Sequence, residues 1–268
     1  MKTGGLPGAL PAPNQKRYVH RCDGRIVISK LSKRRRGHPV LDGIELELQA
    51  GEVLGLMGSN GVGKTTLIKC LLDFIRADAG EIVIFGDSSH SPAARRHLAY
   101  LPERFQLPYH QTGREFLQMM MRFHETHSQD GIVDAQLESL DLDPRCLEQR
   151  ARTYSKGMAQ KIGLAACLMS NKPLIVLDEP MSGLDPKARL CFKRRLAEEK
   201  AKGRTLLFTT HMPGDVEPLC DRLGILVDGR LSYFGSPAAW REKYAAPSLE
   251  GAYLDCVGGT TGISRHVA

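Results

Sequence analysis

The amino-acid sequence predicts an α/β protein in which a mixed or parallel sheet forms the core and a helical subdomain is inserted. Two observations predict this class. "PLIVLDEP" and "RTLLFTTH" each hold a short, nearly unbroken apolar run, as parallel strands covered on both faces do. Earlier in the chain, from about residue 88 to residue 153, the pattern is mostly helical, most clearly in "REFLQMMMRFHE" and "VDAQLESLDL".

Composition and charge limit the class of protein. The 268 residues suffice for one large domain or two small ones, and 42% hydrophobic with 25% charged residues fits a globular chain. A net charge of +7 is compatible with a nucleotide, nucleic acid or lipid headgroups without choosing among them. Seven cysteines without a CxxC pair argue against a disulfide framework or a zinc site. No apolar run approaches the ~18–20 residues that span a bilayer, so we expect work at a membrane to need a partner that spans it.

The first part of the chain is expected to form strands. Residues 1–23 are interpreted as a flexible, Gly- and Pro-rich arm. "RIVISKL" (Arg25–Leu31) predicts a first strand, and a basic run, "SKRRRGH" (Ser32–His38), follows it. "IELEL" (Ile44–Leu48) alternates apolar and charged residues, as a half-exposed strand does. The apolar segments "EVLGLMG" and "GEIVIFG" predict two further strands.

The last part of the chain predicts a hairpin followed by a tail. "LGILVDGRLSYFG" holds Asp228–Gly229 between two apolar runs, which is a hairpin signal. A short tail is expected after about Pro237. We therefore expect a core domain over residues 24–240, with the helical subdomain inserted at about 88–155, and a C-terminal tail over 241–268.

The stretch "GSNGVGKTT" joins the strand "EVLGLMG" to a helix that the apolar spacing of "TTLIKCLLDFI" predicts. Its spacing, GxxxxGK[ST], is that of a phosphate-binding loop. Glycines let several backbone N–H groups point at phosphate, and the start of the helix favours negative charge. We expect Lys64 to reach the β- and γ-phosphates and the Thr65 hydroxyl to ligate Mg²⁺. The predicted nucleotide-binding residues here are Gly58, Ser59, Asn60, Gly61, Val62, Gly63, Lys64, Thr65 and Thr66.

The segment "LIVLDEP" supplies two carboxylates. Its buried strand is expected to deliver Asp178 to the carboxyl edge of the sheet, where ligands bind in open α/β sheets. Asp178 can hold Mg²⁺, and Glu179 can polarise an attacking water as general base. Alone, the pair would be read as a solvated acidic turn. Together with the phosphate-binding loop it predicts a P-loop NTPase core.

A third segment, "YSKGMAQKIGLAACLM", places Ser155 and Gly157 at the start of a predicted helix, where a hydroxyl and N–H groups form an anion site. With it, the sequence closely resembles the ATP-binding subunit of an ABC transporter over roughly residues 25–256. "YSKGM" stands where that family has its LSGGQ signature, and "MSGLD" resembles its D-loop. "TTH" resembles the switch histidine, and "AYLPERF" the segment that contains the Q-loop.

The resemblance implies a dimeric motor. Two subunits pair head to tail, so that the loop and Asp178–Glu179 of one face Ser155 and Gly157 of the other across ATP. His211 is implied to contact the γ-phosphate, and Asp185 to couple the two sites. ATP binding closes the dimer and hydrolysis reopens it. The implied partners are a second ATP-binding subunit, expected to be a second copy of this chain, and a multi-span membrane permease.

Two motifs depart from the family pattern. Lys156 and Met158 replace the commonest glycine and glutamine of the signature, but Ser155 and Gly157 remain, so anion binding is expected to persist. Glu103 stands where most relatives have glutamine, and its charge near triphosphate costs energy unless a cation screens it. The predicted metal ligands are Thr65, Asp178 and Glu103, and the predicted catalytic residues are Lys64, Glu179 and His211.

A third departure concerns adenine. The family usually places an aromatic residue under the base just after the first strand, where this chain has its basic run. A guanidinium from Arg34 to Arg36, or the ring of His38, either stacks on the base or is a solvated charge. The sequence leaves both readings open.

The resemblance also points to a subgroup. "YLPE", "SKGM", "DEPMSGLDP" and "GDVEPLCDR" resemble the members that pair with ABC-2-type permeases, mostly bacterial exporters. This implies ATP-driven export from the cytoplasmic face of the plasma membrane, with ATP and Mg²⁺ as cofactors and no nucleic acid partner. Two alternatives stay open. One is a soluble relative that acts on ribosomes or nucleic acid, and the other is a regulatory subunit that hydrolyses little ATP.

Overall fold

The computed structural model describes residues 24–126, 130–217 and 219–260, and it confirms the α/β class with a mixed sheet. The strands span Arg25–Arg35 (β1), His38–Gln49 (β2), Val53–Met57 (β3), Ala79–Ile84 (β4), Asp87–Ser88 (β5), Leu98–Leu101 (β6), Leu174–Leu177 (β7), Thr205–Thr210 (β8), Arg222–Val227 (β9) and Arg230–Gly235 (β10). The α-helices span Lys64–Leu71 (α1), Pro92–Arg95 (α2), Gly113–Phe123 (α3), Asp130–Glu138 (α4), Lys156–Met169 (α5), Pro186–Ala201 (α6), Pro237–Lys243 (α7) and Leu249–Thr260 (α8). Short 3₁₀ helices span Pro144–Glu148, Ala151–Thr153 and Pro213–Asp215. None of these described helices is both long and apolar enough to cross a bilayer.

The strands form two sheets, with orders β10-β9-β3-β8-β7-β6 and β2-β1-β4-β5. In the six-stranded sheet only β10 is antiparallel to its neighbour. Every residue of β3, β7 and β8 is buried, which confirms the prediction of covered parallel strands. Because β3, β8, β7 and β6 lie side by side and parallel, their carboxyl ends meet at one edge of the sheet.

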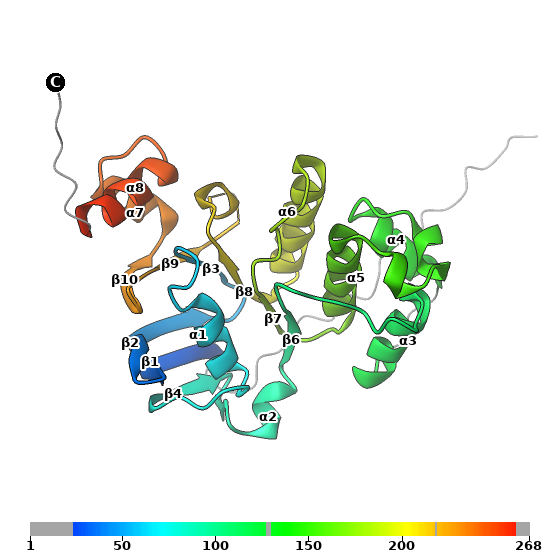
Figure 1. Cartoon of the computed structure of the whole chain (residues 1–268), viewed down its shortest axis with the longest axis horizontal. Helices are drawn as coiled ribbons and strands as arrows, with labels where there is room; N and C mark the ends of the chain where they lie inside the picture. The colour runs from blue at the N-terminus through cyan, green and yellow to red at the C-terminus, as the bar shows by residue number, and fades with distance from the viewer. Residues whose placement is uncertain (1–23, 127–129, 218, 261–268) are drawn as a thin grey trace, which may run out of the picture.

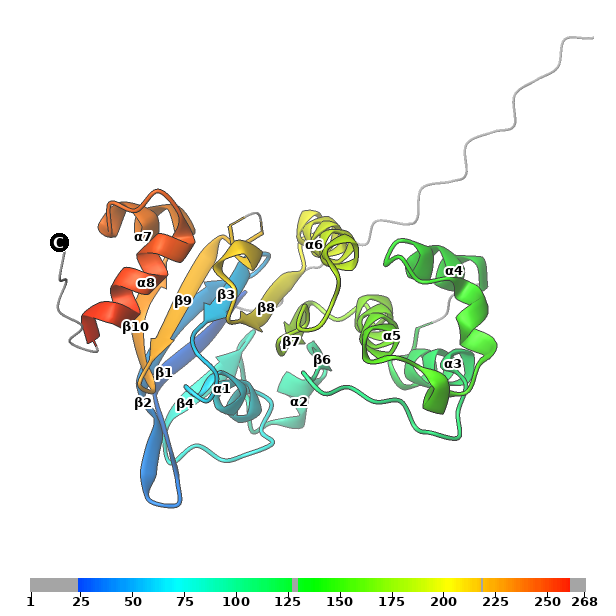
Figure 2. The ribbon, with the colours of Figure 1, turned by 45° about the horizontal axis from the view of Figure 1, so that its top comes forward.

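The basic run belongs to a β-hairpin. Strand β1 continues beyond the expected Arg25–Leu31, because it pairs with β2 from Arg25↔Gln49 as far as Arg35↔His38. The chain reverses at Arg36 and Gly37, whose φ angles are 51° and 83°. Figure 2 shows this hairpin, in blue, extending below the rest of the domain.

The region expected to be mostly helical contains a strand of the core. Strand β6 pairs in parallel with β7, from Leu98↔Leu174 to Leu101↔Leu177. Four residues are too few for periodicity to reveal a strand, and only the pairing with β7 defines it. Beyond β6, helices α3, α4 and α5 gather at one end of the molecule, while α7 and α8 lie at the other (Figures 1 and 2).

The end of the described chain is folded. Residues beyond Pro237, expected as a tail, form α7 and α8, which pack on the sheet. Trp240 is fully buried, and its ring centroid lies 4.6 Å from that of Tyr233 and 4.5 Å from that of Tyr244. Met57 of β3 belongs to the same apolar cluster. Apolar contact with the core sheet therefore extends to α8. The expected arm, residues 1–23, lies outside the described residues.

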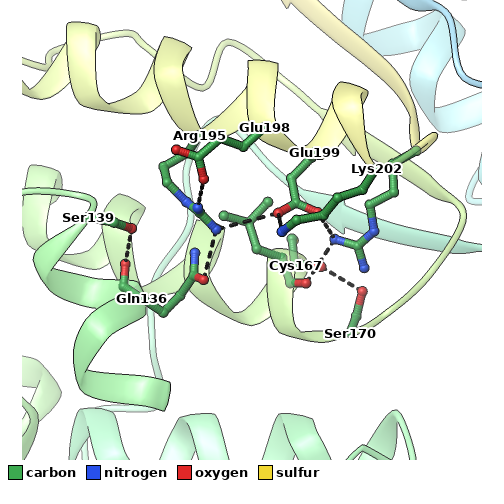
Figure 3. A network of polar contacts seen from close by, with 10 residues as sticks. Gln136, Ser139, Cys167, Ser170, Arg195, Glu198, Glu199 and Lys202 are labelled. Carbon is green, nitrogen blue, oxygen red and sulfur yellow. Dashed lines mark hydrogen bonds and ion pairs between the residues drawn. The ribbon is translucent and has the colours of Figure 1, made fainter. Parts of the chain in front are cut away.

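A polar network joins the helical end of the molecule to helix α6 (Figure 3). Arg195 of α6 donates to Gln136 of α4 at 2.9 Å and to Glu199 at 3.4 Å. Glu199 also pairs with Arg204 at 2.9 Å, and these two side chains are 3% and 1% exposed. Arg204 donates in turn to the carbonyl oxygen of Leu168 in α5 at 2.8 Å. Loss of one partner from a buried ion pair costs about 3–5 kcal/mol, so this network ties α4, α5 and α6 together firmly.

Candidate functional site: the carboxyl edge of the sheet

The loop between β3 and α1 has the strand-to-helix setting that its motif requires, since α1 begins at Lys64. Gly63 precedes the helix with φ 117°, a region that L side chains rarely adopt. A Cβ atom at Gly63 would lie 2.8 Å from the carbonyl oxygen of Val40, and one at Gly58 would lie 2.7 Å from that of Leu226. Both glycines are therefore needed for the loop to pack against β2 and β9.

The side chain of Lys64 is buried inside this loop. Only 5% of the residue is exposed, and its Nζ donates to the carbonyl oxygens of Gly58 at 2.7 Å and Ser59 at 3.2 Å. The same Nζ lies 3.1 Å from Oε1 of Glu179. Lys64 therefore joins the phosphate-binding loop to the acidic segment after β7, which lie far apart in the sequence.

Asp178 follows β7 and is 1% exposed. Burial is the main cause that raises the pKa of its carboxyl group, and hydrogen bonds from Thr209 and Thr65 oppose this rise. The negative charges of Glu103 and Glu179 add to it. Asp178 thus lies in an environment that disfavours its negative charge, which a bound cation would neutralise.

Glu179 lies between a lysine and a histidine. Its Oε1 is paired with Lys64, and its Oε2 lies 2.9 Å from Nδ1 of His211, the residue after β8. The backbone of Glu179 is left-handed, with φ 46°, and its N–H donates to Oγ1 of Thr209 at 2.8 Å. The residue is only 8% exposed. Its carboxylate is therefore fixed in the site and not free in solvent.

The predicted metal ligands fit a hard cation. Thr65, Asp178 and Glu103 offer only oxygen atoms, which suits Mg²⁺. Within the described ranges, no group of three or more His, Cys, Asp or Glu side chains is placed to hold a metal by itself. Mg²⁺ is usually bound by one or two carboxylates plus substrate phosphates. The residues present therefore suit a metal that arrives with a nucleotide.

The other predicted residues form a second cluster at two helix starts. The Ser155 hydroxyl accepts from the N–H of Met158 at 3.2 Å and caps α5, and Asp185 caps α6 by accepting from the N–H of Ala188 at 2.9 Å. The starts are neighbours, because a Cβ atom at Gly157 would lie 3.8 Å from Leu184. Among the described residues, no hydrogen bond or ion pair directly joins Ser155, Gly157 or Asp185 to Lys64, Asp178, Glu179 or His211.

Two threonines at the site were not among the residues predicted from the sequence. Thr209 and Thr210 end β8 and are 0% and 3% exposed. Thr209 donates to Oδ1 of Asp178 at 2.7 Å, whereas Thr210 donates to Oδ2 of Asp215 at 3.1 Å. The available signal was two hydroxyls at the end of an otherwise apolar strand, directly before His211.

Comparison with known proteins identifies the family of this chain. A family model described as "ABC transporter" matches residues 41–182. An uncharacterised ABC transporter ATP-binding protein of Nostoc sp. is 38% identical over 199 residues, covering 73% of this chain and 59% of the relative. Nod factor export ATP-binding protein I of Burkholderia thailandensis is 36% identical over 216 residues, covering 79% of this chain and 71% of the relative. The chain spans 59% and 56% of the length of the relatives from Nostoc sp. and Synechocystis sp..

Two solved structures share the fold. An ATP-binding subunit of an ABC transporter has a TM-score of 0.77 at 29% identity, covering 87% of this chain and 99% of its own. A bacterial Atm1-family ABC exporter with ATP bound has a TM-score of 0.75 at 20% identity, covering 94% of this chain and 44% of its own, and this likeness concerns the fold alone. With the family match and the similarity of its relatives, the chain belongs to the ABC transporter family and carries the ATP-binding domain, whose ATP hydrolysis drives transport in that family.

Proposed function

We propose that this chain is the ATP-hydrolysing subunit of an exporter and works through a separate ABC-2-type membrane permease. The observation that carries the catalytic part is the position of Glu179, held between Lys64 and His211 beside the phosphate-binding loop. The similarity to Nod factor export ATP-binding protein I supports export as the direction of transport.

The site residues take the following roles. Backbone N–H groups from Gly58 to Thr66 cradle the phosphates of ATP. Lys64 exchanges its contacts with the loop carbonyls for phosphate oxygens and stabilises the charge on the leaving ADP. Glu179 accepts a proton from the water that attacks the γ-phosphorus. His211 orients Glu179 and contacts the γ-phosphate.

Thr65, Asp178 and Glu103 would hold Mg²⁺. When bound, this ion neutralises the charge on the β- and γ-phosphates. The support comes from the chemistry of the donors and from the environment of Asp178, where burial and two further carboxylates disfavour a negative charge. A cation relieves that unfavourable arrangement.

We propose that Ser155 and Gly157 act on the nucleotide of a second copy of the chain. Ser155 is exposed, and its hydroxyl accepts from Met158 at the start of its own helix. Asp185 lies at the neighbouring helix start, where it would couple the two sites of the dimer. ATP binding would close two copies head to tail, and hydrolysis would reopen them.

Binding to that permease would hold this chain at the cytoplasmic face of the plasma membrane.

The test of the proposed function is affinity purification of the full chain from detergent-solubilised membranes, with mass spectrometry of the proteins that remain bound. We expect a stoichiometric multi-span protein. The purified pair should hydrolyse ATP, and the same pair with Glu179→Gln should not. Ribosomal proteins or nucleic acid in place of a membrane protein would contradict the exporter function.

A further inference from the structure

The hydroxyl of Thr209 bridges two residues of the proposed site. Thr209 is fully buried near the end of β8. Its Oγ1 donates to Oδ1 of Asp178 at 2.7 Å and accepts from the backbone N–H of Glu179 at 2.8 Å. Both distances are those of well-formed hydrogen bonds. The only proton of the hydroxyl goes to Asp178, and one of its lone pairs takes the N–H of Glu179.

The sheet register explains why this residue meets Asp178. Strands β7 and β8 are parallel neighbours, and Leu177 lies opposite Phe208. Asp178 and Thr209 are therefore the next pair along the two strands. Since Oδ1 is occupied by the Thr209 hydroxyl, rotation of the carboxylate is restricted. The other oxygen, Oδ2, keeps a defined direction at the edge of the sheet.

The second bond acts on the backbone of Glu179. Its φ of 46° is uncommon for a residue with a side chain. The N–H of this left-handed residue is satisfied by the Thr209 hydroxyl, in the interior of the protein where an unsatisfied N–H is costly. This backbone conformation directs the carboxylate of Glu179 toward Lys64 and His211.

We propose that Thr209 is a positioning residue for ATP hydrolysis. Its single hydroxyl fixes the metal ligand Asp178 and the general base Glu179 relative to each other, so that both reach the nucleotide together. This inference rests on the proposed function of those two residues. Threonine suits the position, because its methyl group fits a fully buried strand while its hydroxyl makes both bonds.

A control variant at Thr205 distinguishes a positioning role from a purely structural one. Thr205 lies on the same strand, is also fully buried and accepts from the N–H of Gly51 at 2.9 Å. It lies at the other end of β8, away from the motif residues. Thr205→Val is therefore a matched control, because it removes the same hydroxyl from the same strand without touching Asp178 or Glu179.

The test compares Thr209→Val, Thr209→Ser and Thr205→Val with the wild-type chain. ATP binding is measured calorimetrically with Mg²⁺ and with EDTA, and kcat and KM are measured for hydrolysis. For Thr209→Val we expect unchanged affinity in EDTA, loss of most of the affinity gained from Mg²⁺, and a kcat lowered by about 10–100-fold, the usual effect of losing a residue that orients a metal ligand. Thr209→Ser should restore both quantities to within about threefold, because it keeps the hydroxyl. Thr205→Val should match the wild type.

The inference is wrong if Thr209→Val keeps the Mg²⁺ effect and the wild-type kcat, or if Thr205→Val loses them equally. It is also wrong if Thr209→Ser does not rescue. If Thr209→Val does not fold, Thr209→Ala removes the same hydroxyl with less bulk and is held to the same outcomes. Undiminished hydrolysis by Glu179→Gln would instead refute the proposed function. Loss of hydrolysis in Glu179→Gln with wild-type behaviour in Thr209→Val would refute only the role of Thr209.

Discussion

The carboxyl edge of the sheet and the paired starts of α5 and α6 differ in how they are built. At the edge, Lys64, Asp178 and Glu179 are buried and joined by ion pairs and hydrogen bonds from three separate strand ends. At the helix starts, Ser155 and Lys156 are exposed. Among the residues that the structure describes, the hydroxyl of Ser155 bonds only within its own helix start.

The difference indicates that the two regions have different roles in the reaction. Buried, mutually fixed groups are what charge stabilisation at a reacting phosphate requires, since they need not reorganise during the reaction. An exposed hydroxyl at the start of a helix is instead suited to meet a group on another molecule. We infer that one region carries the chemistry and the other completes it for a second copy.

The largest effect is expected at the buried lysine. Lys64→Ala removes the charge that we propose faces the phosphates, and it leaves Oε1 of Glu179 without its ion pair. We expect ATP affinity to fall by about 100-fold or more, which corresponds to about 2.7 kcal/mol. Isothermal titration calorimetry measures this directly. Wild-type affinity in the variant would remove the phosphate-binding role from the loop.

A change at Glu179, the proposed general base, should separate ATP binding from ATP hydrolysis. Glu179→Gln keeps the shape of the side chain but cannot take up a proton. ATP should still bind, and kcat should fall by about 100-fold or more, because general-base catalysis contributes about 10²–10⁴-fold. Light scattering should show an ATP-dependent dimer. Hydrolysis at the wild-type rate would place the base elsewhere.

At the helix starts we expect a loss of hydrolysis without a loss of binding. Ser155→Ala should leave ATP affinity of the single chain within about twofold and lower kcat by about 100-fold, the lower end of the range for removing one preorganised donor. The variant also loses a helix cap, which costs about 1 kcal/mol. Ser236→Ala is the matched control, because Ser236 caps α7 by accepting from Ala239 at 3.1 Å. Equal losses of activity in both variants would reduce the role of Ser155 to capping.

The smallest effect on hydrolysis is expected for a change at Lys156. Lys156 is exposed at the start of α5, in contrast to the buried Lys64. Since solvent screens an exposed charge, Lys156→Ala should change kcat by no more than about threefold. Steady-state ATPase assays measure it. A loss comparable to that of Lys64→Ala would show that the two regions do not differ as described.

Much of the edge could be predicted from the sequence, because its parts are local. The apolar runs of β3, β7 and β8 are read directly from the chain, and so is the order of strand, loop and helix around Lys64. The turn at Asp228–Gly229 is also local, and both residues have the positive φ angles that such a hairpin needs. A motif whose structure depends only on residues adjacent to it in the sequence can be recognised from that sequence.

Other features depend on contacts between distant segments. The pairing of Lys64 with Glu179 requires β8 to lie between β3 and β7, and no short stretch encodes that order. Thr209 was missed because threonine is common in strands, and its partners, Asp178 and Glu179, follow a different strand. Strand β6 and the helices after Pro237 are likewise defined by packing against the sheet.

The most direct test of the division between the two regions is to mix Lys64→Ala chains with Ser155→Ala chains and measure ATP hydrolysis. If Ser155 acts on the nucleotide of a partner, the mixed dimer contains one site with an intact loop from one chain and an intact Ser155 from the other. The activity of the mixture should then exceed the sum of the two separate variants and depend on protein concentration. Activity equal to that sum would contradict the account, because Ser155 would then serve only the site of its own chain.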